Sequence, residues 1–320
     1  MPGPSWRYGD LILVAGSGHP QLAEEIAECL GVPLLPREII VFPNENIFVR
    51  LLASVRGQDV FVIQSTASPV NYNLMELFIL LDTIKRANAG RITAVIPYLA
   101  YARSDKKDQP RVPITARLVA DFIAVAGADR WVTIDLHASQ IQGFFSIPGD
   151  ELTAFHLLSD YLLEKNFSPE EAVVVAADLG FAKKARNYAA KLNLPIAFVE
   201  KRRTGTQTEA LTVIGDVGGK KVILVDDEVD TAGSVSGAVR VLKEHGAEEI
   251  YLCFTHAVLS GPAVDRLRAL PLKEIICTNT IPIPPHKRLP NMTVLSIGPM
   301  LAEVIRRIHE GRSVGQLFNE

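Results

Sequence analysis

Cysteine is scarce in this sequence, and the few residues that occur are widely separated. Cys29, Cys253 and Cys277 form no Cys-x-x-Cys pair and no mixed cysteine and histidine spacing. Their placement excludes a zinc-finger type of site and offers no disulfide framework of the kind that small secreted domains use. We therefore expect three buried, reduced thiols, as in a protein of a reducing compartment.

Long apolar runs and an excess of positive charge are missing as well. The longest apolar runs, such as residues 77–81 and 173–177, are far shorter than the roughly 18 residues that a membrane-spanning helix needs. The amino terminus shows no apolar signal segment with a cleavage site. The 33 Lys and Arg residues face 36 Asp and Glu residues, for a net charge of −3, whereas a nucleic-acid-binding protein is usually basic. These features predict a cytoplasmic protein that binds neither a membrane nor nucleic acid.

The apolar residues that are present suffice for two cores. A chain of 320 residues is about twice the usual domain length of roughly 150. In each half, continuous runs of Val, Ile and Leu alternate with longer amphipathic stretches. Such alternation is typical of parallel strands buried on both faces, with crossover helices outside. The pattern predicts an α/β fold with two doubly wound parallel-sheet domains.

The two halves share a layout. A strand-like run over residues 11–15 precedes a helical stretch and Pro33, and a similar run over 172–177 precedes a helical stretch and Pro195. Residues 59–64 and 221–226 begin a second pair of matching units. We expect duplicated domains over residues 1–149 and 150–320. A further helix is expected over 300–309, and its periodicity leaves open which domain it packs on.

The residues just after each apolar run are the candidates for function, because ligands of such sheets bind beyond the carboxyl ends of the strands. The sharpest signal lies within residues 222–234. Asp226 and Asp227 follow an apolar strand and offer acceptors for a sugar diol or a metal-bound water. Residues 230–234 then form a small-residue turn into a helix, where backbone N–H groups and hydroxyls can hold a phosphate. Such a turn alone is more often a helix cap. An apolar strand, a pair of aspartates and a small-residue turn in this order, however, rarely occur together.

This turn is similar to the phosphoribosyl pyrophosphate loop of type I phosphoribosyltransferases, and longer segments narrow the resemblance. With residues 54–65, 96–108, 135–145, 278–281 and 301–307, the chain resembles the ribose-phosphate pyrophosphokinase family nearly end to end. The resemblance implies a type I phosphoribosyltransferase-like fold in both halves. It also implies Mg²⁺-dependent transfer of the β,γ-diphosphoryl group of ATP to the anomeric hydroxyl of ribose 5-phosphate, with release of AMP.

The resemblance further implies roles for single residues. Lys201 and Arg203 correspond to a catalytic basic pair on a mobile loop, and His137 and Asp178 correspond to metal-contacting residues. The implied ATP-binding residues are Asn44, Glu45, Asn46, Arg103, Ser104 and His137. The implied ribose 5-phosphate-binding residues are Asp226, Asp227, Asp230, Thr231, Ala232, Gly233 and Ser234.

Several positions depart from the family pattern. Asn44 and Asn46 stand where carboxylates are usual, Ser104 replaces a glutamine, and Leu179 and Phe181 alter a loop that usually carries paired glycines. Because the family's 42–46 loop reaches the adenine site of an adjacent subunit, the resemblance implies a homo-oligomer with that loop near a neighbour's active site.

Two other functions stay open at this point. The altered loops keep open a catalytically weak regulatory paralogue. The phosphate turn is shared with phosphoribosyltransferases that consume the diphosphorylated sugar, although their domain is normally single.

Overall fold

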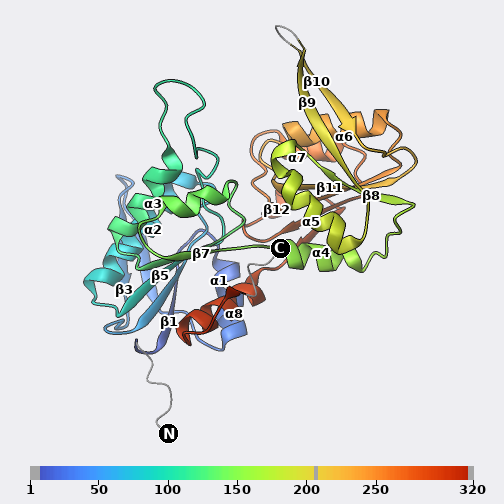
Figure 1. Cartoon of the computed structure of the whole chain (residues 1–320). Helices are drawn as coiled ribbons and strands as arrows, with labels where there is room; N and C mark the ends of the chain where they lie inside the picture. Colours follow the sequence, from blue (N-terminus) through green and yellow to red (C-terminus); the bar gives the residue numbers. More distant parts are fainter. Residues whose placement is uncertain (1–7, 205–207, 316–320) are drawn as a thin grey trace. The chain divides into compact units, whose positions relative to one another are not determined.

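The protein is described by a computed structural model that covers residues 8–204 and 208–315, apart from the side chains of 179 and 201–210. The chain divides into two compact units (Figure 1). Unit 1 comprises Met1–Thr153, Thr280–Pro282 and Ile297–Asn319, and unit 2 comprises Ala154–Asn279 and Ile283–Ser296, with Glu320. Within the described residues, no helix is both long and apolar enough to cross a membrane.

Unit 1 contains a five-stranded, wholly parallel sheet in the order β1-β4-β5-β6-β7. Its strands are β1 (Leu11–Ala15), β4 (Asp59–Ile63), β5 (Arg91–Ile96), β6 (Arg130–Ile134) and β7 (Gly149–Leu152). Its helices are α1 (Pro20–Leu30), α2 (Val70–Arg86), α3 (Thr115–Ala126) and α8 (Gly298–His309), with the 3₁₀ turn η1 (Ser139–Phe144). Figure 1 shows α2 and α3 on one face of the sheet and α1 and α8 on the other.

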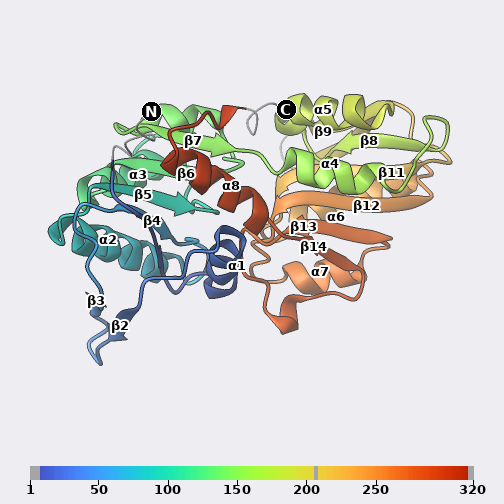
Figure 2. The ribbon, with the colours of Figure 1, turned by 90° about the horizontal axis from the view of Figure 1, so that it is seen from below.

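Unit 2 contains a seven-stranded sheet in the order β10-β9-β8-β11-β12-β13-β14, in which only the pair β9 and β10 is antiparallel (Figure 2). Its strands are β8 (Ala172–Ala176), β9 (Ile196–Thr204), β10 (Thr208–Ile214), β11 (Lys221–Glu228), β12 (Glu249–His256), β13 (Glu274–Thr278) and β14 (Met292–Leu295). Its helices are α4 (Phe155–Leu163), α5 (Ala182–Leu192), α6 (Gly233–Glu244) and α7 (Ala263–Ala269), with the 3₁₀ turns η2 (Leu179–Phe181) and η3 (Pro285–Lys287).

The strands predicted from continuous apolar runs are buried on both faces. All five residues of β4 and all five of β8 are buried. Helices cover both sides of each sheet, so neither face needs polar side chains. The predicted α/β fold with two parallel-sheet units is confirmed.

Each unit also carries an antiparallel hairpin at the same point of its chain. In unit 1 the hairpin is formed by β2 (Arg37–Val41) and β3 (Ile47–Leu51), and in unit 2 by β9 and β10. Asn44, in the first turn, lies 11 positions after Pro33, and position 206, between β9 and β10, lies 11 positions after Pro195. The loop predicted to reach adenine and the loop predicted to be catalytic are therefore equivalent parts of the two halves.

Two helices are exchanged between the duplicated halves. Helix α4 follows β7 of unit 1 along the chain but packs on α5 of unit 2. Helix α8 follows β14 of unit 2 but packs on α1 of unit 1. Since α1 and α5 each follow the first strand of their half, α4 and α8 occupy equivalent places. The helix expected over 300–309 thus belongs to the unit built mainly from the amino-terminal half.

A buried ion pair fixes α8 to the first sheet. The carboxylate of Asp59, fully buried at the start of β4, accepts hydrogen bonds from Arg91 Nε at 2.8 Å and Nη2 at 2.6 Å. It also lies 2.8 Å from His309 Nδ1, and Arg91 Nη2 donates to the carbonyl of Ile308 at 3.1 Å. These contacts join β4, β5 and the end of α8.

Unit 2 has a comparable polar cluster at the start of β13. The Glu274 carboxylate lies 2.6 Å from Lys165 Nζ and accepts from the hydroxyls of Tyr161 at 2.6 Å and Thr293 at 2.8 Å. Burial opposes ionisation of this carboxyl, but the three donors outweigh it and lower the pKa of Glu274 below its ordinary value.

Candidate active site

Paired carboxylates lie at the carboxyl end of β11 in unit 2. Asp227 is only 8% exposed, and its backbone N–H donates to Asp226 Oδ1 at 2.9 Å. Burial, followed by the charges of Asp227 and Asp178, raises the pKa of Asp226 well above its ordinary value. A cation or the hydroxyl donors of a sugar would relieve this repulsion.

The small-residue turn that follows these carboxylates leads into α6. Thr231, Gly233 and Ser234 are exposed, whereas Ala232 is buried and adopts a left-handed backbone with φ of 58°. Ala232 is the residue that caps α6, and no side-chain cap is formed there. The backbone N–H groups at the start of this helix are therefore available for an anion, which the helix dipole also favours.

A segment that the sequence analysis did not single out supports this turn from the end of β12. The Ser260 hydroxyl donates to Asp230 Oδ1, and its backbone N–H donates to the Asp230 carbonyl at 3.0 Å. Leu259 N–H donates to the Val229 carbonyl at 2.9 Å. Asp230 therefore helps to hold the loop itself. The signal that could have found Ser260 is its position just past a buried strand at the same edge of the sheet.

Asp178 lies exposed at the end of β8, where η2 leads into α5. Its Oδ1 accepts a hydrogen bond from the backbone N–H of Phe181 at 3.0 Å. The Phe181 side chain is buried, with Lys184 Nζ 5.8 Å from the ring centroid. The backbone of Phe181 is therefore hydrogen-bonded within the loop, at the place where the family pattern has a glycine.

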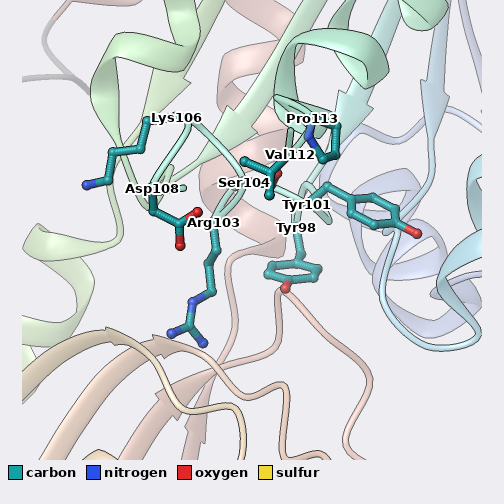
Figure 3. Close-up of a pocket in the computed structure, with 9 residues that line it drawn as sticks. Tyr98, Tyr101, Arg103, Ser104, Lys106, Asp108, Val112 and Pro113 are labelled. Carbon is teal, nitrogen blue, oxygen red and sulfur yellow. The ribbon is translucent and has the colours of Figure 1, made fainter. Parts of the chain in front are cut away.

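The predicted nucleotide residues of unit 1 include two in the loop after β5. This loop lines a cavity of about 390 Å³. Figure 3 shows Tyr98, Tyr101 and Lys106 around it, with the Arg103 side chain extending away from the loop. Two aromatic rings and two cations in one loop are suited to a ligand that carries both a flat ring and phosphates.

Ser104 has a structural part in the same loop. Its Oγ accepts a hydrogen bond from Thr115 N–H at 3.2 Å, and its carbonyl accepts from Ala116 N–H at 3.1 Å. Both donors belong to the first turn of α3, whose own cap residue, Ile114, has no side-chain acceptor. Ser104 thus caps α3 from a distance, so the loop and the helix hold each other in place.

His137 is exposed and follows β6 in unit 1. The turn before it is fixed by two contacts: Asp135 N–H donates to the Leu152 carbonyl at 2.9 Å, and Leu136 N–H donates to Glu151 Oε1 at 3.0 Å. These contacts hold the backbone that leads from β6 to His137.

Buried Asp105 joins the segment after His137 to the cavity loop. Gln140 Nε2 donates to Asp105 Oδ2 at 2.7 Å. His137 and Arg103 are therefore presented by two connected loops of one unit.

The residues expected to select the base form the exposed turn between β2 and β3. Asn44 Oδ1 accepts from Asn46 N–H at 3.3 Å, and Phe42 N–H donates to the Asn46 carbonyl at 2.9 Å. Glu45 adopts a left-handed backbone with φ of 66°. The Asn44 amide thus stabilises the turn, while the side chain of Asn46 projects from an exposed position.

The predicted catalytic pair lies on β9. In the backbone register, Lys201 faces Leu211 and Arg203 faces Glu209 of β10. The side chains of Lys201 and Arg203 lie outside the described part of the chain, so their roles stay predictions.

The duplication identifies the positions of unit 1 that correspond to the carboxylates of unit 2. Leu11 pairs with Asp59 in unit 1, as Ala172 pairs with Lys221 in unit 2. Counting forward from these pairs matches Gln64 with Asp226 and Ser17 with Asp178. Both carboxylates of unit 2 are therefore replaced by neutral side chains in unit 1.

In unit 1 the corresponding edge is filled by the protein's own side chains. The carboxylate of Glu76, fully buried in α2, accepts from Ser17 N–H at 2.5 Å, from Ser17 Oγ at 2.5 Å and from Gln64 Nε2 at 3.0 Å. Gln64 Oε1 accepts from Gly18 N–H at 2.8 Å. The donors at this edge of unit 1 that could bind an anion are already used, whereas the start of α6 in unit 2 has no side-chain cap.

Among the described residues, no three His, Cys, Asp or Glu side chains come together as a ready-made metal site. This arrangement still suits Mg²⁺, which usually keeps several waters and is held by one or two carboxylates together with substrate phosphates. The exposed Asp178 and the crowded Asp226 are carboxylates of that kind in unit 2.

Known proteins match the chain over nearly its whole length. Residues 11–127 match the family described as the N-terminal domain of ribose phosphate pyrophosphokinase, and residues 202–319 match the phosphoribosyl synthetase-associated domain. The ribose-phosphate pyrophosphokinases of Caldanaerobacter subterraneus subsp. tengcongensis and Clostridium acetobutylicum are 52% and 50% identical, over 98% and 96% of this chain and 99% and 97% of theirs. The crystal structure of phosphoribosylpyrophosphate synthetase from Mycobacterium smegmatis matches with a TM-score of 0.90 at 47% identity, over 94% of this chain and 99% of that one.

Proposed function

The chain belongs to the ribose-phosphate pyrophosphokinase family, and from this premise we propose that it makes phosphoribosyl pyrophosphate and AMP from ribose 5-phosphate and ATP. The reaction joins the anomeric oxygen of the sugar to the β-phosphorus of ATP and breaks the bond between the α- and β-phosphates. The anomeric hydroxyl loses its proton, and AMP leaves with the bridging oxygen.

One observation carries the placement of the sugar. Paired carboxylates stand beside an uncapped helix start in unit 2, while Glu76 and Gln64 fill the equivalent edge in unit 1. We assign the ribose hydroxyls to Asp226 and Asp227, and the 5-phosphate to residues 230–234. This assignment matches hydrogen-bond donors with acceptors, since carboxylates accept from sugar hydroxyls and backbone N–H groups donate to phosphate oxygens.

The remaining roles follow the family assignment of single residues. Arg103, Ser104, His137 and residues 44–46 serve ATP, and Arg103 offers a guanidinium fork that can bind phosphate oxygens in pairs. Asp178 and His137 would hold Mg²⁺, which when bound neutralises phosphate charge and orients the reacting groups.

Lys201 and Arg203 supply positive charge to the group in transfer. Diphosphoryl transfer spreads negative charge over phosphate oxygens and needs little covalent help from the protein. Their place on a hairpin suits a lid that excludes water from ATP.

The proposal includes the organisation of the protein. The two halves, residues 1–149 and 150–320, act as duplicated domains of the type I phosphoribosyltransferase fold. The chain works in the cytoplasm as a homo-oligomer, with the 42–46 turn near the active site of a neighbouring subunit.

Release of AMP from ATP and ribose 5-phosphate by the purified chain tests the proposal. We expect AMP and phosphoribosyl pyrophosphate in equal amounts with Mg²⁺, and none in excess EDTA. Replacing Asp227 with asparagine should remove most of the activity, whereas replacing the exposed Asp265 should not. A regulatory paralogue would give little AMP, and a phosphoribosyltransferase would require a base and release pyrophosphate; either result would reject the proposal.

A further inference from the structure

The proposed sugar site has a surplus of negative charge for a site that binds a phosphate dianion. Residues 226–234 include four carboxylates, those of Asp226, Asp227, Glu228 and Asp230, and no Lys, Arg or His. The start of a helix supplies only about half a positive charge. A cation close to the turn would therefore make the local field more favourable for phosphate.

Arg266 of α7 is placed to supply that charge. Its Nη1 donates to the carbonyl of Thr231 at 2.9 Å. The same nitrogen lies 3.4 Å from the point that a Cβ atom on Gly233 would occupy. The guanidinium thus lies beside the turn in which the 5-phosphate is proposed to bind.

Arg266 is also not neutralised by a neighbour. The side chain is exposed, and within the described part of the chain it pairs with no carboxylate. Arg268, two positions further on the same helix, instead donates to Asp265 Oδ1 at 2.7 Å. The helix therefore carries one arginine engaged in a surface ion pair and one directed to the phosphate turn.

The position of Arg266 is fixed by the contacts that join its segment to the turn. Ser260, which precedes α7, hydrogen-bonds to Asp230 through both its hydroxyl and its backbone N–H. Arg266 N–H continues the segment by donating to the Pro262 carbonyl at 3.0 Å. Because the backbone of this segment is held and the guanidinium itself is hydrogen-bonded to the Thr231 carbonyl, part of the side-chain entropy is already lost before a ligand binds.

We propose that Arg266 binds the 5-phosphate of ribose 5-phosphate and also positions the turn that holds it. By holding the Thr231 carbonyl on one side, it turns the N–H groups of this peptide and the next toward the ligand. Its charge offsets the nearby carboxylates, and its remaining N–H groups face no protein acceptor among the described residues. This inference rests on the proposed function and adds a residue to its sugar site.

The test compares Arg266→Ala and Arg266→Lys with Arg268→Ala, a matched exposed arginine of the same helix. At saturating ATP and Mg²⁺, Arg266→Ala should raise KM for ribose 5-phosphate about 10- to 100-fold, the range for loss of one charge-assisted hydrogen bond. The KM for ATP should change by less than about threefold, and kcat by less than about fivefold, because the lost contact is with the non-reacting phosphate. Arg266→Lys should recover part of the loss, and Arg268→Ala should behave as the unaltered protein.

Added salt gives a second readout that a merely structural role would not change. The KM of the unaltered protein for ribose 5-phosphate should rise with ionic strength more steeply than that of Arg266→Ala, because one charge pair is already absent in the variant. An unchanged KM in Arg266→Ala overturns the proposal. So does an equal loss for both substrates, or an equal loss in Arg268→Ala.

Direct binding separates this proposal from the proposed reaction. Ribose 5-phosphate is titrated calorimetrically into the unaltered chain and into Arg266→Lys. The lysine variant retains the positive charge, and it can be measured even if Arg266→Ala does not fold. Weaker binding by the lysine variant, with an unchanged melting temperature, supports the role of Arg266 even if no AMP is formed. Equal binding by both proteins rejects the role of Arg266 even if AMP is formed.

Discussion

Replacing Glu76 with alanine should destabilise unit 1 far more than a single surface change would. The Glu76 carboxylate is the acceptor for the Ser17 N–H, the Ser17 hydroxyl and the Gln64 amide. Alanine leaves the buried Gln64 amide without that acceptor, at a cost of about 1–3 kcal/mol, and the two donors of the exposed Ser17 lose hydrogen bonds that contribute about 0.5–1.5 kcal/mol each. The sum, about 2–6 kcal/mol, is a large part of the stability of a typical domain, about 5–15 kcal/mol.

Urea unfolding followed by Trp131 fluorescence measures this effect within unit 1. Trp131 is buried in the core of unit 1 and stacks on Phe145, with 4.3 Å between ring centroids. The other tryptophan, Trp6, is removed by a Trp6→Phe background. With a slope of about 2 kcal/mol per M urea, Glu76→Ala should lower the midpoint by about 1 M or more. Glu76→Gln retains one oxygen acceptor, so its midpoint should lie between those of Glu76→Ala and the unaltered protein.

The matched control is Asp82→Ala on the same helix. Asp82 pairs with Arg86 at the surface, at 2.7 Å, and such pairs contribute about 0.2–1 kcal/mol. Its midpoint should therefore fall by about 0.5 M or less. If Glu76→Ala shifts the midpoint no more than Asp82→Ala does, the Glu76 carboxylate does not hold the loops of unit 1. In that case Glu76 does not explain why the donors at this edge of unit 1 are already used.

Three further outcomes are expected. Lys201→Ala should lower kcat on the order of 10²-fold or more with a smaller change in KM for ribose 5-phosphate, because its charge is proposed to act on the group in transfer; an unchanged kcat removes it from the mechanism. The pKa of Glu274 is lowered in the folded state, so its ion pair with Lys165 stabilises the fold at pH values above the unfolded-state pKa. This stabilisation is lost as the pH falls through the folded-state pKa. Glu274→Gln should therefore lower the melting temperature at pH 7, and the difference from the unaltered protein should shrink as the pH falls; a difference of the same size at every pH contradicts this assignment. The double variant Asn44→Asp, Asn46→Glu should raise the ratio of kcat/KM for ATP to that for GTP, because an amide can present either its oxygen or its NH₂ to a purine; an equal ratio in both proteins excludes these side chains from base selection.

The sequence was enough to predict the elements whose signal is local. The fully buried β4 and β8 are continuous apolar runs, and Asp226 and Asp227 stand directly after such a run, at the edge where ligands bind in parallel sheets. A short segment of sequence contains all that these predictions require.

Features that depend on contacts between distant segments could not be predicted in this way. Ser260 and Arg266 approach the phosphate turn only because β12 lies next to β11. Glu76 is an ordinary helical glutamate in sequence, and its burial against Ser17 follows from the place of α2 beside β4. The partner of α8 depends on the path of the chain between the units, which periodicity does not record.

The exchange of α4 and α8 has a consequence for the order in which the protein matures on the ribosome. Helix α1 packs against α8, and α8 follows every strand of unit 2 along the chain. The unit whose sheet is synthesised first therefore waits, with α1 lacking its partner helix, until the whole sheet of unit 2 has been made. Unit 2 does not wait, since α4 precedes β8. Of the two units, the one whose sheet is made first is the last to be completed, and its nascent form is the one that needs protection from aggregation.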